Sequence, residues 1–322
     1  MKSKSKKICL LFAGGTTVLD KDIRGSTVYG PGDIPGWLAL APEVSLMAQI
    51  EPVFVAADNE LIGAPLWQKI SQEIYRRLND FDGFVVLTDL DSVLYAGTAL
   101  SFALRNINKP VILTSSQITE ANVKLPDWLA KKAKAYGGLG VKANLINAVQ
   151  LATMNLPAVA LMFGNRIIRA VKAQRSGFLG LNIFKSADES YLGRIDFGIS
   201  LTEKFKNIPA PVVLKNGFET NISIHHYFPG ADLQDLNRQK IRGRLLQGLT
   251  DIDLLKSYKS LTPLIVYNRF LFDVPDQENI LIINNMTWET CLVKFMWALS
   301  QSKRLAEVRG FMFNEHADEF IL

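Results

Sequence analysis

The sequence Ile-Cys-Leu-Leu-Phe-Ala-Gly-Gly-Thr-Thr, residues 8–17, is the clearest architectural signal in this chain. Its apolar half, Ile8–Ala13, is short and uninterrupted, as expected of a strand that is buried on both faces of a parallel sheet. Gly14 and Gly15 then favour a tight turn whose backbone N–H groups can approach a ligand closely. Ligands of parallel sheets bind beyond the carboxyl ends of the strands, so we expect functional residues directly after this strand.

The basic residues before the strand raise the alternative of a secretory signal peptide. Four lysines precede the apolar run, but the run has only six residues, fewer than the roughly 7–15 of a signal peptide's apolar region. No other run approaches the roughly 18 apolar residues of a membrane span. The two cysteines, Cys9 and Cys291, both lie in apolar runs and cannot form a disulfide framework. We therefore predict a cytoplasmic protein without a membrane segment.

Short apolar runs alternate with helical stretches along the first part of the chain. The expected strands are Ile8–Ala13, Pro52–Ala56, Phe84–Leu87, Pro110–Thr114 and Ala158–Phe163. Between them, apolar residues recur at helical spacing over 93–104 and again over 145–152. This alternation predicts an α/β fold, with a doubly wound and mostly parallel sheet that is covered by helices on both faces.

A second, smaller α/β domain is expected to follow. The less periodic residues 195–211 contain Gly198, Pro209 and Pro211 and predict a linker. We place the larger domain at residues 1–200 and the smaller one at residues 201–322. The elements expected in the smaller domain are strands Val212–Leu214, Leu264–Tyr267 and Ile280–Ile283 and helices Trp288–Ser300 and Arg304–Phe313.

Composition and spacing exclude several classes of function. The chain has 322 residues, of which 48% are hydrophobic, so it can build sizeable cores. Its net charge of +5 is spread without an arginine-rich stripe, so no nucleic-acid partner is expected. The three histidines, His225, His226 and His316, lack metal-ligand spacing, so no metal is expected. Gly14-Gly15 is neither a dinucleotide fingerprint nor part of a P-loop.

Polar residues that follow the expected strands are the candidate chemical groups. The Gly15 N–H can stabilise an oxyanion, and the Thr16 hydroxyl can act as a nucleophile once it is activated. Tyr29 lies in a loop, residues 19–36, that is long enough to act as a lid. After the third strand, Asp91 and Ser92 are placed either to take part in the site or to cap the next helix.

Five motifs in this order resemble the bacterial-type L-asparaginases, the cytoplasmic type more than the secreted type. Ala13-Gly14-Gly15-Thr16 resembles the family's T-G-G-T, while residues 82–86 and 99–102 resemble the two ends of its second motif. Residues 109–114 resemble K-P-V-V-x-T, and residues 144–148 resemble N-L-x-N-A. Residues 285–297 resemble D-M-T-P-E followed by L-V-K-L-M-W. The resemblance spans nearly the whole chain.

The resemblance implies hydrolysis of the side-chain amide of asparagine or a related small molecule, with no cofactor. It implies that Thr16 is the nucleophile, that Tyr29 assists from the lid, and that Asp91 belongs to a supporting Thr–Asp–Lys group. Lys172 is the expected lysine, with Arg169 as the alternative, because residues 164–166 resemble the start of a family G-N-R-x-x-K segment. A homodimer or homotetramer, with active sites between subunits, is also implied.

This chain departs from the family pattern after the third strand. In the ungapped register, Thr88, Asp89, Leu90 and Asp91 stand where the family has H-G-T-D. Leucine carries no hydroxyl, so the supporting group loses its threonine at Leu90. A register shifted by two residues would instead use Thr88 and Asp89 as the Thr–Asp pair.

The segment that resembles the family's carboxylate-holding loop differs as well. Asp58 and Trp67 match its ends, but Asn59 replaces a serine and Glu60 follows. If Glu60 and Asp89 both faced a substrate carboxylate, each pair of charges at about 4 Å would repel by about 4 kcal/mol at an effective dielectric of about 20. The candidate substrate-binding residues are Gly15, Asp58, Asn59, Glu60, Thr88, Asp89 and Leu90.

Three functional hypotheses follow from these residues. The first is an amidohydrolase with reduced activity or an altered substrate, and Thr16 and Lys172 favour it. The second is a catalytically inactive protein of the same fold with a binding or structural role, which Leu90 favours. The third, a nucleotide-binding regulatory protein, has only the expected sheet architecture in its support.

Overall fold

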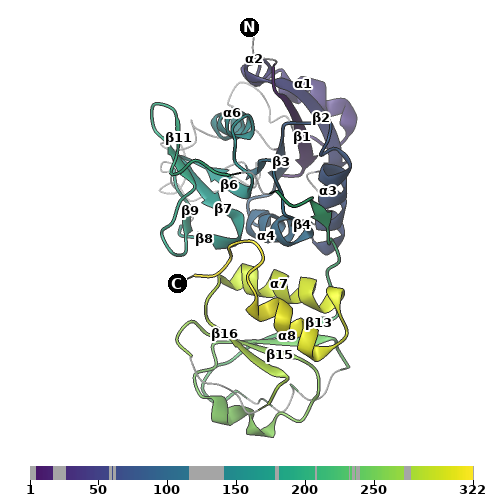
Figure 1. Ribbon diagram of the computed structural model, residues 1–322, viewed down its shortest axis with the longest axis vertical. Helices are drawn as coiled ribbons and strands as arrows, with labels where there is room; N and C mark the ends of the chain where they lie inside the picture. Colours follow the sequence, from purple (N-terminus) through teal and green to yellow (C-terminus); the bar gives the residue numbers. More distant parts are fainter. Residues whose placement is uncertain are drawn as a thin grey trace, which may run out of the picture. The chain divides into compact units, whose positions relative to one another are not determined.

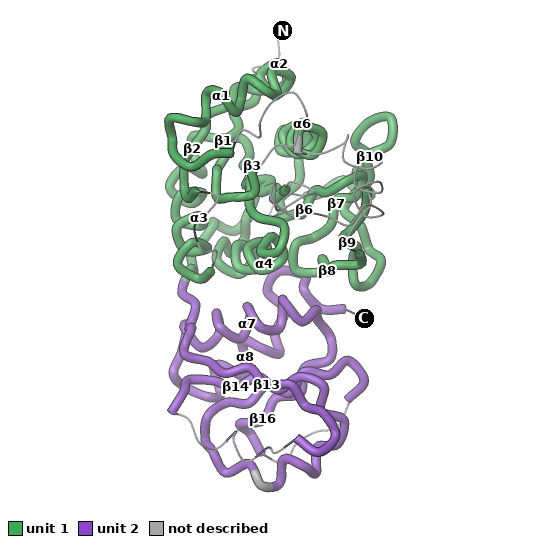
Figure 2. The backbone as a smooth tube through the Cα atoms, turned by 180° about the vertical axis from the view of Figure 1, so that it is seen from behind, with its two compact units in different colours: residues 1–216 green, residues 217–322 purple. Residues whose placement is uncertain are grey.

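The computed structural model describes residues 5–16, 27–57, 60, 63–115, 141–177, 181–206, 209–231, 233, 236, 240–271 and 277–321. The chain divides into two compact units, Met1–Asn216 and Gly217–Leu322 (Figure 2). The first unit contains the expected residues of the candidate site.

The first unit is built on an eight-stranded sheet with the strand order β11-β10-β7-β6-β5-β3-β1-β2. Five neighbouring strands, from β6 to β2, pair in parallel, and β7, β10 and β11 extend the sheet with antiparallel pairs. The strands are β1 Lys7–Ala13, β2 Gln49–Ala56, β3 Gly83–Thr88, β5 Val111–Thr114, β6 Val159–Phe163, β7 Arg166–Arg169, β10 Gly193–Ile195 and β11 Ile199–Leu201. The prediction of a mostly parallel α/β sheet is confirmed.

The strand order reverses between β1 and β3. From β1 the chain passes outward to β2, and it then returns to the other side of β1 to form β3, β5 and β6 in turn. The carboxyl ends of β1 and β3 lie side by side, because Ala13 pairs with Thr88. A reversal of this kind opens a crevice at the carboxyl ends of the two strands, which is where doubly wound folds bind their ligands.

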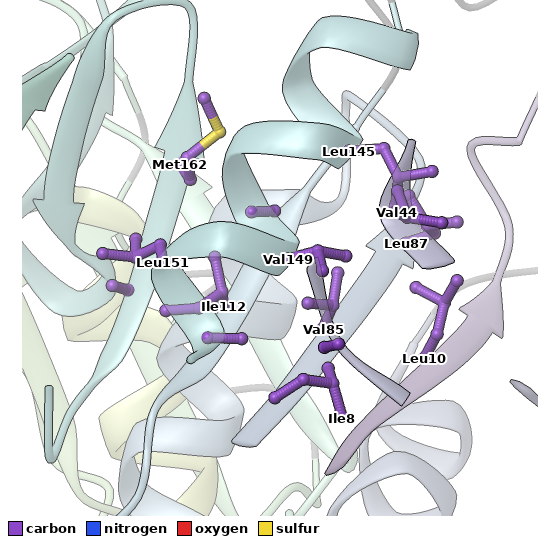
Figure 3. Packing of buried hydrophobic residues seen from close by; sticks show 14 of the residues in the cluster. Ile8, Leu10, Val44, Val85, Leu87, Ile112, Leu145, Val149, Leu151 and Met162 are labelled. Carbon is purple, nitrogen blue, oxygen red and sulfur yellow. The ribbon is translucent and has the colours of Figure 1, made fainter. Parts of the chain in front are cut away.

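Helices cover both faces of this sheet (Figure 1). The helices of this unit are α1 Ile34–Leu38, α2 Val44–Met47, α3 Ala64–Arg76, α4 Val93–Ala103 and α6 Val141–Ala152, with 3-10 turns η1 Pro31–Asp33 and η3 Ala170–Lys172. On one face, residues of α1, α2 and α6 pack with alternate residues of β1, β3 and β5 in a single core cluster. Figure 3 shows Leu145 and Val149 of α6 beside Leu87 and Val85 of β3. The helices α3 and α4 contact each other, and α4 contacts η3, β5 and β6.

The start of the segment that sequence analysis assigned to a linker, residues 195–201, lies within a strand pair of the sheet. β10 and β11 make an antiparallel pair over residues 193–201. Each has only three residues, too few to show a period of two, which is why the segment looked irregular. Two further pairs complete the unit: β4 Leu104–Arg105 with β12 Val213–Leu214, and β8 Ala173–Arg175 with β9 Phe184–Ser186. β12, expected in the second domain, therefore belongs to the first unit.

The second unit has a parallel sheet of its own, in the order β13-β14-β15-β16. Its elements are β13 Ile222–His226, β14 Gly243–Gln247, β15 Leu264–Tyr267, β16 Ile280–Ile283, the 3-10 helix η5 Ile252–Ser257, and helices α7 Trp288–Gln301 and α8 Leu305–Phe313. The Thr287 side chain caps α7 by accepting a hydrogen bond from the Thr290 N–H. Lys294 of α7 forms a fully buried ion pair with Glu319, which fixes the last described residues to that helix.

No helix in the described part of the chain is long and apolar enough to cross a membrane.

Candidate active site

The turn after β1 has a conformation that strongly favours glycine. Gly14 and Gly15 have φ angles of +96° and +65°, in the region that other residues rarely adopt. A Cβ atom on Gly15 would also collide with the carbonyl group of Thr88. The two glycines therefore let the chain turn tightly against the end of β3, and this brings Thr16 to the crevice between β1 and β3.

Thr16 is fully buried, and both its side-chain hydroxyl and its backbone carbonyl accept hydrogen bonds. The Val28 N–H donates to Thr16 Oγ1 at 3.0 Å. The Trp37 indole Nε1 donates to the Thr16 carbonyl at 2.7 Å, and its ring packs edge-on against Phe12 with centroids 5.2 Å apart. The candidate nucleophile thus has a defined position, and a substrate can reach it only if the residues that cover it move.

Tyr29 follows Val28 directly, so the expected lid tyrosine stands next to the residue that contacts Thr16. Its side chain is 62% exposed. Its backbone N–H donates to Asp33 Oδ2 at 2.9 Å, as does the Gly30 N–H. Residues 17–26 of the expected lid lie outside the described residues.

The segment after β3 is shaped by a carboxylate that binds its own backbone. Asp89 Oδ1 accepts hydrogen bonds from the N–H groups of Asp91, at 2.6 Å, and Ser92, at 3.3 Å. Asp89, and neither Asp91 nor Ser92, therefore satisfies the backbone at the start of α4, because its side chain can fold back over the two following residues. Leu90 is buried at 3% exposure, so the position expected to carry a hydroxyl is part of the apolar core.

The cation that contacts Asp91 is Arg175. Arg175 Nη1 lies 2.7 Å from Asp91 Oδ1, with the two side chains 33% and 67% exposed. Arg175 is the last residue of β8, and sequence analysis considered only Arg169 and Lys172. The sequence offered little to single out Arg175 as the partner of Asp91. It is one of several basic residues that follow β6, and it lies 84 residues away from Asp91 in the chain. A guanidinium remains charged at any ordinary pH, so Arg175 cannot exchange a proton in this position.

Lys172 has a different partner. Its Nζ lies 3.0 Å from Asp188 Oδ2, in a buried pair beside η3. Burial raises the pKa of Asp188, but hydrogen bonds from Ser190, Lys172 and Ser186 outweigh it and hold that pKa well below its usual range. Arg169 ends β7, opposite Ala160 of β6. The catalytic assignment of Lys172 remains a prediction.

The expected carboxylate-holding loop is described only in part. Asp58 and Asn59 lie outside the described residues. Glu60 Oε1 accepts a hydrogen bond from the Ala57 N–H at 2.9 Å, so this carboxylate also stabilises its own loop. Trp67 is buried on α3.

The two cysteine thiols do not compete with Thr16 as nucleophiles. Burial raises the pKa of the Cys9 thiol to about 12, and burial also raises the pKa of Cys291, so both are poor nucleophiles near neutral pH. Among the residues that the structure describes, no group of three or more His, Cys, Asp or Glu side chains is placed to hold a metal ion.

Comparisons with known proteins identify the relatives of this arrangement. The family model "Asparaginase, N-terminal" matches residues 7–127, which include the glycine turn and the segment after β3. L-asparaginase 1 of Escherichia coli strain K12 is 30% identical over 219 residues, covering 65% of this chain and 58% of that protein. Over this first part the chain is similar to the asparaginases, and its match spans little more than half the length of that relative.

Proteins of lower identity match nearly all of the chain. One component of the glutamyl-tRNA(Gln) amidotransferase of Pyrococcus abyssi is 23% identical over 351 residues, covering 97% of this chain and 76% of that protein. The solved structure of L-asparaginase I from Vibrio cholerae has a TM-score of 0.79 at 23% identity, covering 99% of this chain and all of its own. The structure of the L-asparaginase from Thermococcus kodakarensis has a TM-score of 0.76 at 20% identity. At these identities the solved structures establish the fold.

Proposed function

We propose that this protein is an asparaginase-type amidohydrolase, which hydrolyses the side-chain amide of asparagine or a related small molecule with Thr16 as the nucleophile. The observation that carries this proposal is the Gly14-Gly15-Thr16 turn at the point where the strand order of the sheet reverses. The tight turn against Thr88 gives the hydroxyl of Thr16 a fixed position at the expected ligand crevice.

The proposed reaction has two halves. Thr16 Oγ1 attacks the amide carbon while its proton passes to a base, and the tetrahedral oxyanion is stabilised by backbone N–H groups such as that of Gly15. The C–N bond then breaks, the leaving nitrogen takes up a proton and departs as ammonia, and the acyl group stays bound to Thr16 as an ester. Water hydrolyses the ester to a carboxylic acid and regenerates the Thr16 hydroxyl. Tyr29 is the proposed proton carrier, since its neighbour Val28 contacts Thr16.

The supporting group works poorly in this chain. Leu90 has no hydroxyl, and Arg175 neutralises Asp91 without being able to accept a proton. A positioned proton-transfer group is worth roughly 10²–10⁴ in rate. We therefore expect turnover of L-asparagine far below that of a family member with an intact Thr–Asp–Lys group, and a preference for substrates that carry no carboxylate near Glu60 and Asp89.

The second candidate function is a binding or structural role without catalysis. The burial of Leu90 and the pairing of Asp91 with Arg175 favour it, because the supporting position then has no threonine hydroxyl and its carboxylate faces a cation that cannot give up a proton. In either case we propose a cytoplasmic protein that forms a homodimer or homotetramer and works without a cofactor.

Release of ammonia from L-asparagine, L-glutamine and simple amides tests the proposal. We expect slow release from at least one of these compounds and none from Thr16→Ala. Thr17→Ala, which changes the neighbouring threonine, serves as the control. Release that persists in Thr16→Ala would contradict the assignment of the nucleophile. An enzyme preparation that releases ammonia from no amide would favour the binding role.

A further inference from the structure

In the described part of the chain, two hydroxyl groups are buried without partners at the carboxyl ends of β3 and β5, and the glycine turn before Thr16 packs against the end of β3. Thr88 ends β3 and Ser115 follows β5, and both residues are fully buried. Neither Thr88 Oγ1 nor Ser115 Oγ has a hydrogen-bond partner among the described residues. Buried polar atoms are nearly always hydrogen-bonded, so two exceptions in adjacent strands require an explanation.

The two hydroxyls are neighbours in the sheet. β3 and β5 pair in parallel with Val86 opposite Leu113 and Leu87 opposite Thr114. The same register, continued by one residue beyond the end of β5, sets Thr88 opposite Ser115 at the carboxyl ends of the two strands. Side chains alternate between the faces of a sheet, so both hydroxyls share the face of Leu113, whose side chain lies beside Gly97 of α4.

The backbone around both residues is firmly held. The Thr88 carbonyl lies against Gly15. The Asn144 side chain joins the residue after β5 to the residue after β6. Its Nδ2 donates to the Ser115 carbonyl at 3.1 Å, and its Oδ1 accepts from the Gly164 N–H at 3.2 Å. A rigid frame with two unsatisfied hydroxyls is the arrangement expected of a preorganised binding site.

The neighbouring threonine shows that an unsatisfied hydroxyl is not general at this edge. Thr114 precedes Ser115 in the chain, points to the opposite face of the sheet, and is equally buried. Its Oγ1 donates to the Met162 carbonyl of β6 at 2.9 Å. Of these three buried hydroxyls, only the two on the α4 face lack partners among the described residues.

We propose that Thr88 and Ser115 form a subsite that recognises the uncharged carboxamide of the substrate. A hydroxyl can donate and accept, so the pair can donate to the amide oxygen while it accepts from the amide NH₂. A carboxylate offers acceptors alone and would leave part of this capacity unused. The inference rests on the proposed function and deepens it, because it names the residues that select a neutral amide.

Binding to a protein that cannot turn over its ligand tests this subsite. The background variant is Thr16→Ala, and the probes are propionamide and propionate, which have the same shape but differ in charge and in donors. Thr88→Val and Ser115→Ala each remove one hydroxyl at nearly constant shape. Thr114→Val removes the hydroxyl that already has a partner and is the matched control. The readouts are the dissociation constant by ligand-observed NMR and the thermal midpoint of the free protein.

The subsite predicts opposite signatures for the two kinds of variant. Thr88→Val and Ser115→Ala should each weaken propionamide binding about fivefold or more while leaving the midpoint of the free protein unchanged or higher, because no hydrogen bond is lost in the free state. Thr114→Val should lower the midpoint and leave propionamide affinity unchanged. Propionate should bind more weakly than propionamide in the background variant.

Three results would overturn the inference. These are absence of propionamide binding, equal affinity for propionate, or unchanged propionamide affinity in both Thr88→Val and Ser115→Ala. Failure of the proposed function is a separate result. If propionamide binding follows the predicted signature but the unaltered protein releases ammonia from no amide, the subsite stands and the proposed catalysis does not.

Discussion

Single residues set the geometry of the candidate site, and Gly15 sets it most directly. Gly15→Ala should destabilise the protein by roughly 1–2 kcal/mol or more, since alanine at φ +65° is strained and its Cβ would meet the Thr88 carbonyl. Thermal or urea unfolding measures this loss. Gly36→Ala is the matched control, because that exposed glycine lies in α1 with no neighbouring atom in the way and alanine favours a helix. Equal effects of the two substitutions would contradict a special role for Gly15.

At the same scale, Leu90 and Arg175 are expected to limit turnover together. Leu90→Thr combined with Arg175→Lys supplies both a hydroxyl and a cation that can exchange a proton, so asparagine hydrolysis should rise by about 10²-fold or more. Ammonia release measures the gain. Leu90→Val with Arg175→Lys is the control, because valine has the shape of threonine without its hydroxyl. If both double variants are equally active, the hydroxyl at position 90 is irrelevant.

At the scale of elements, the turn that follows β9 is fixed to η3 by the Lys172–Asp188 pair. The pKa of Asp188 is lower in the folded protein than in the unfolded chain, so the unfolded chain binds more protons in acid. This contribution is present above about pH 4, the ordinary pKa of an aspartate, and is lost as the pH falls through the lower folded value. Asp188→Asn should lower the thermal midpoint at pH 7 and flatten its decline in acid, which a series of unfolding scans from neutral to acidic pH would detect.

The control for this prediction is Asp253→Asn, in an exposed pair with Lys256, which should change neither the midpoint at pH 7 nor its decline in acid. A decline in Asp188→Asn as steep as that of the unaltered protein would mean that other carboxylates cause it.

At the scale of the whole molecule, the resemblance to the L-asparaginases leads us to expect a homodimer or homotetramer with active sites between subunits. Light scattering at micromolar concentration should give two or four times the mass of one chain. Activity should fall on dilution below the dissociation constant, since each site would lose the residues of the partner subunit. A single-chain mass together with full activity would exclude this arrangement.

Much of the fold could be predicted because it follows from local patterns. Continuous apolar runs such as Ile8–Ala13 and Leu264–Tyr267 were recognised as strands because they are too short for a typical helix and long enough for a strand that is buried on both faces. β13 and β14 were missed for the opposite reason. Ile222–His226 is half exposed and carries two histidines, and Gly243–Gln247 includes an arginine that is buried only in the folded unit. Neither segment has an apolar pattern of its own.

The sequence by itself determined the mostly parallel sheet and the glycine turn before Thr16. Each depends on residue type and on neighbours in the chain. The tertiary structure decided that Arg175 pairs with Asp91 and that Lys172 pairs with Asp188. It also decided that Thr88 and Ser115, at the ends of two paired strands, bury hydroxyls without partners among the described residues. These contacts depend on strand order and register, which bring residues far apart in sequence to the same edge of a sheet. Composition and periodicity describe which faces are buried, but they do not specify which charged or polar groups meet across neighbouring strands.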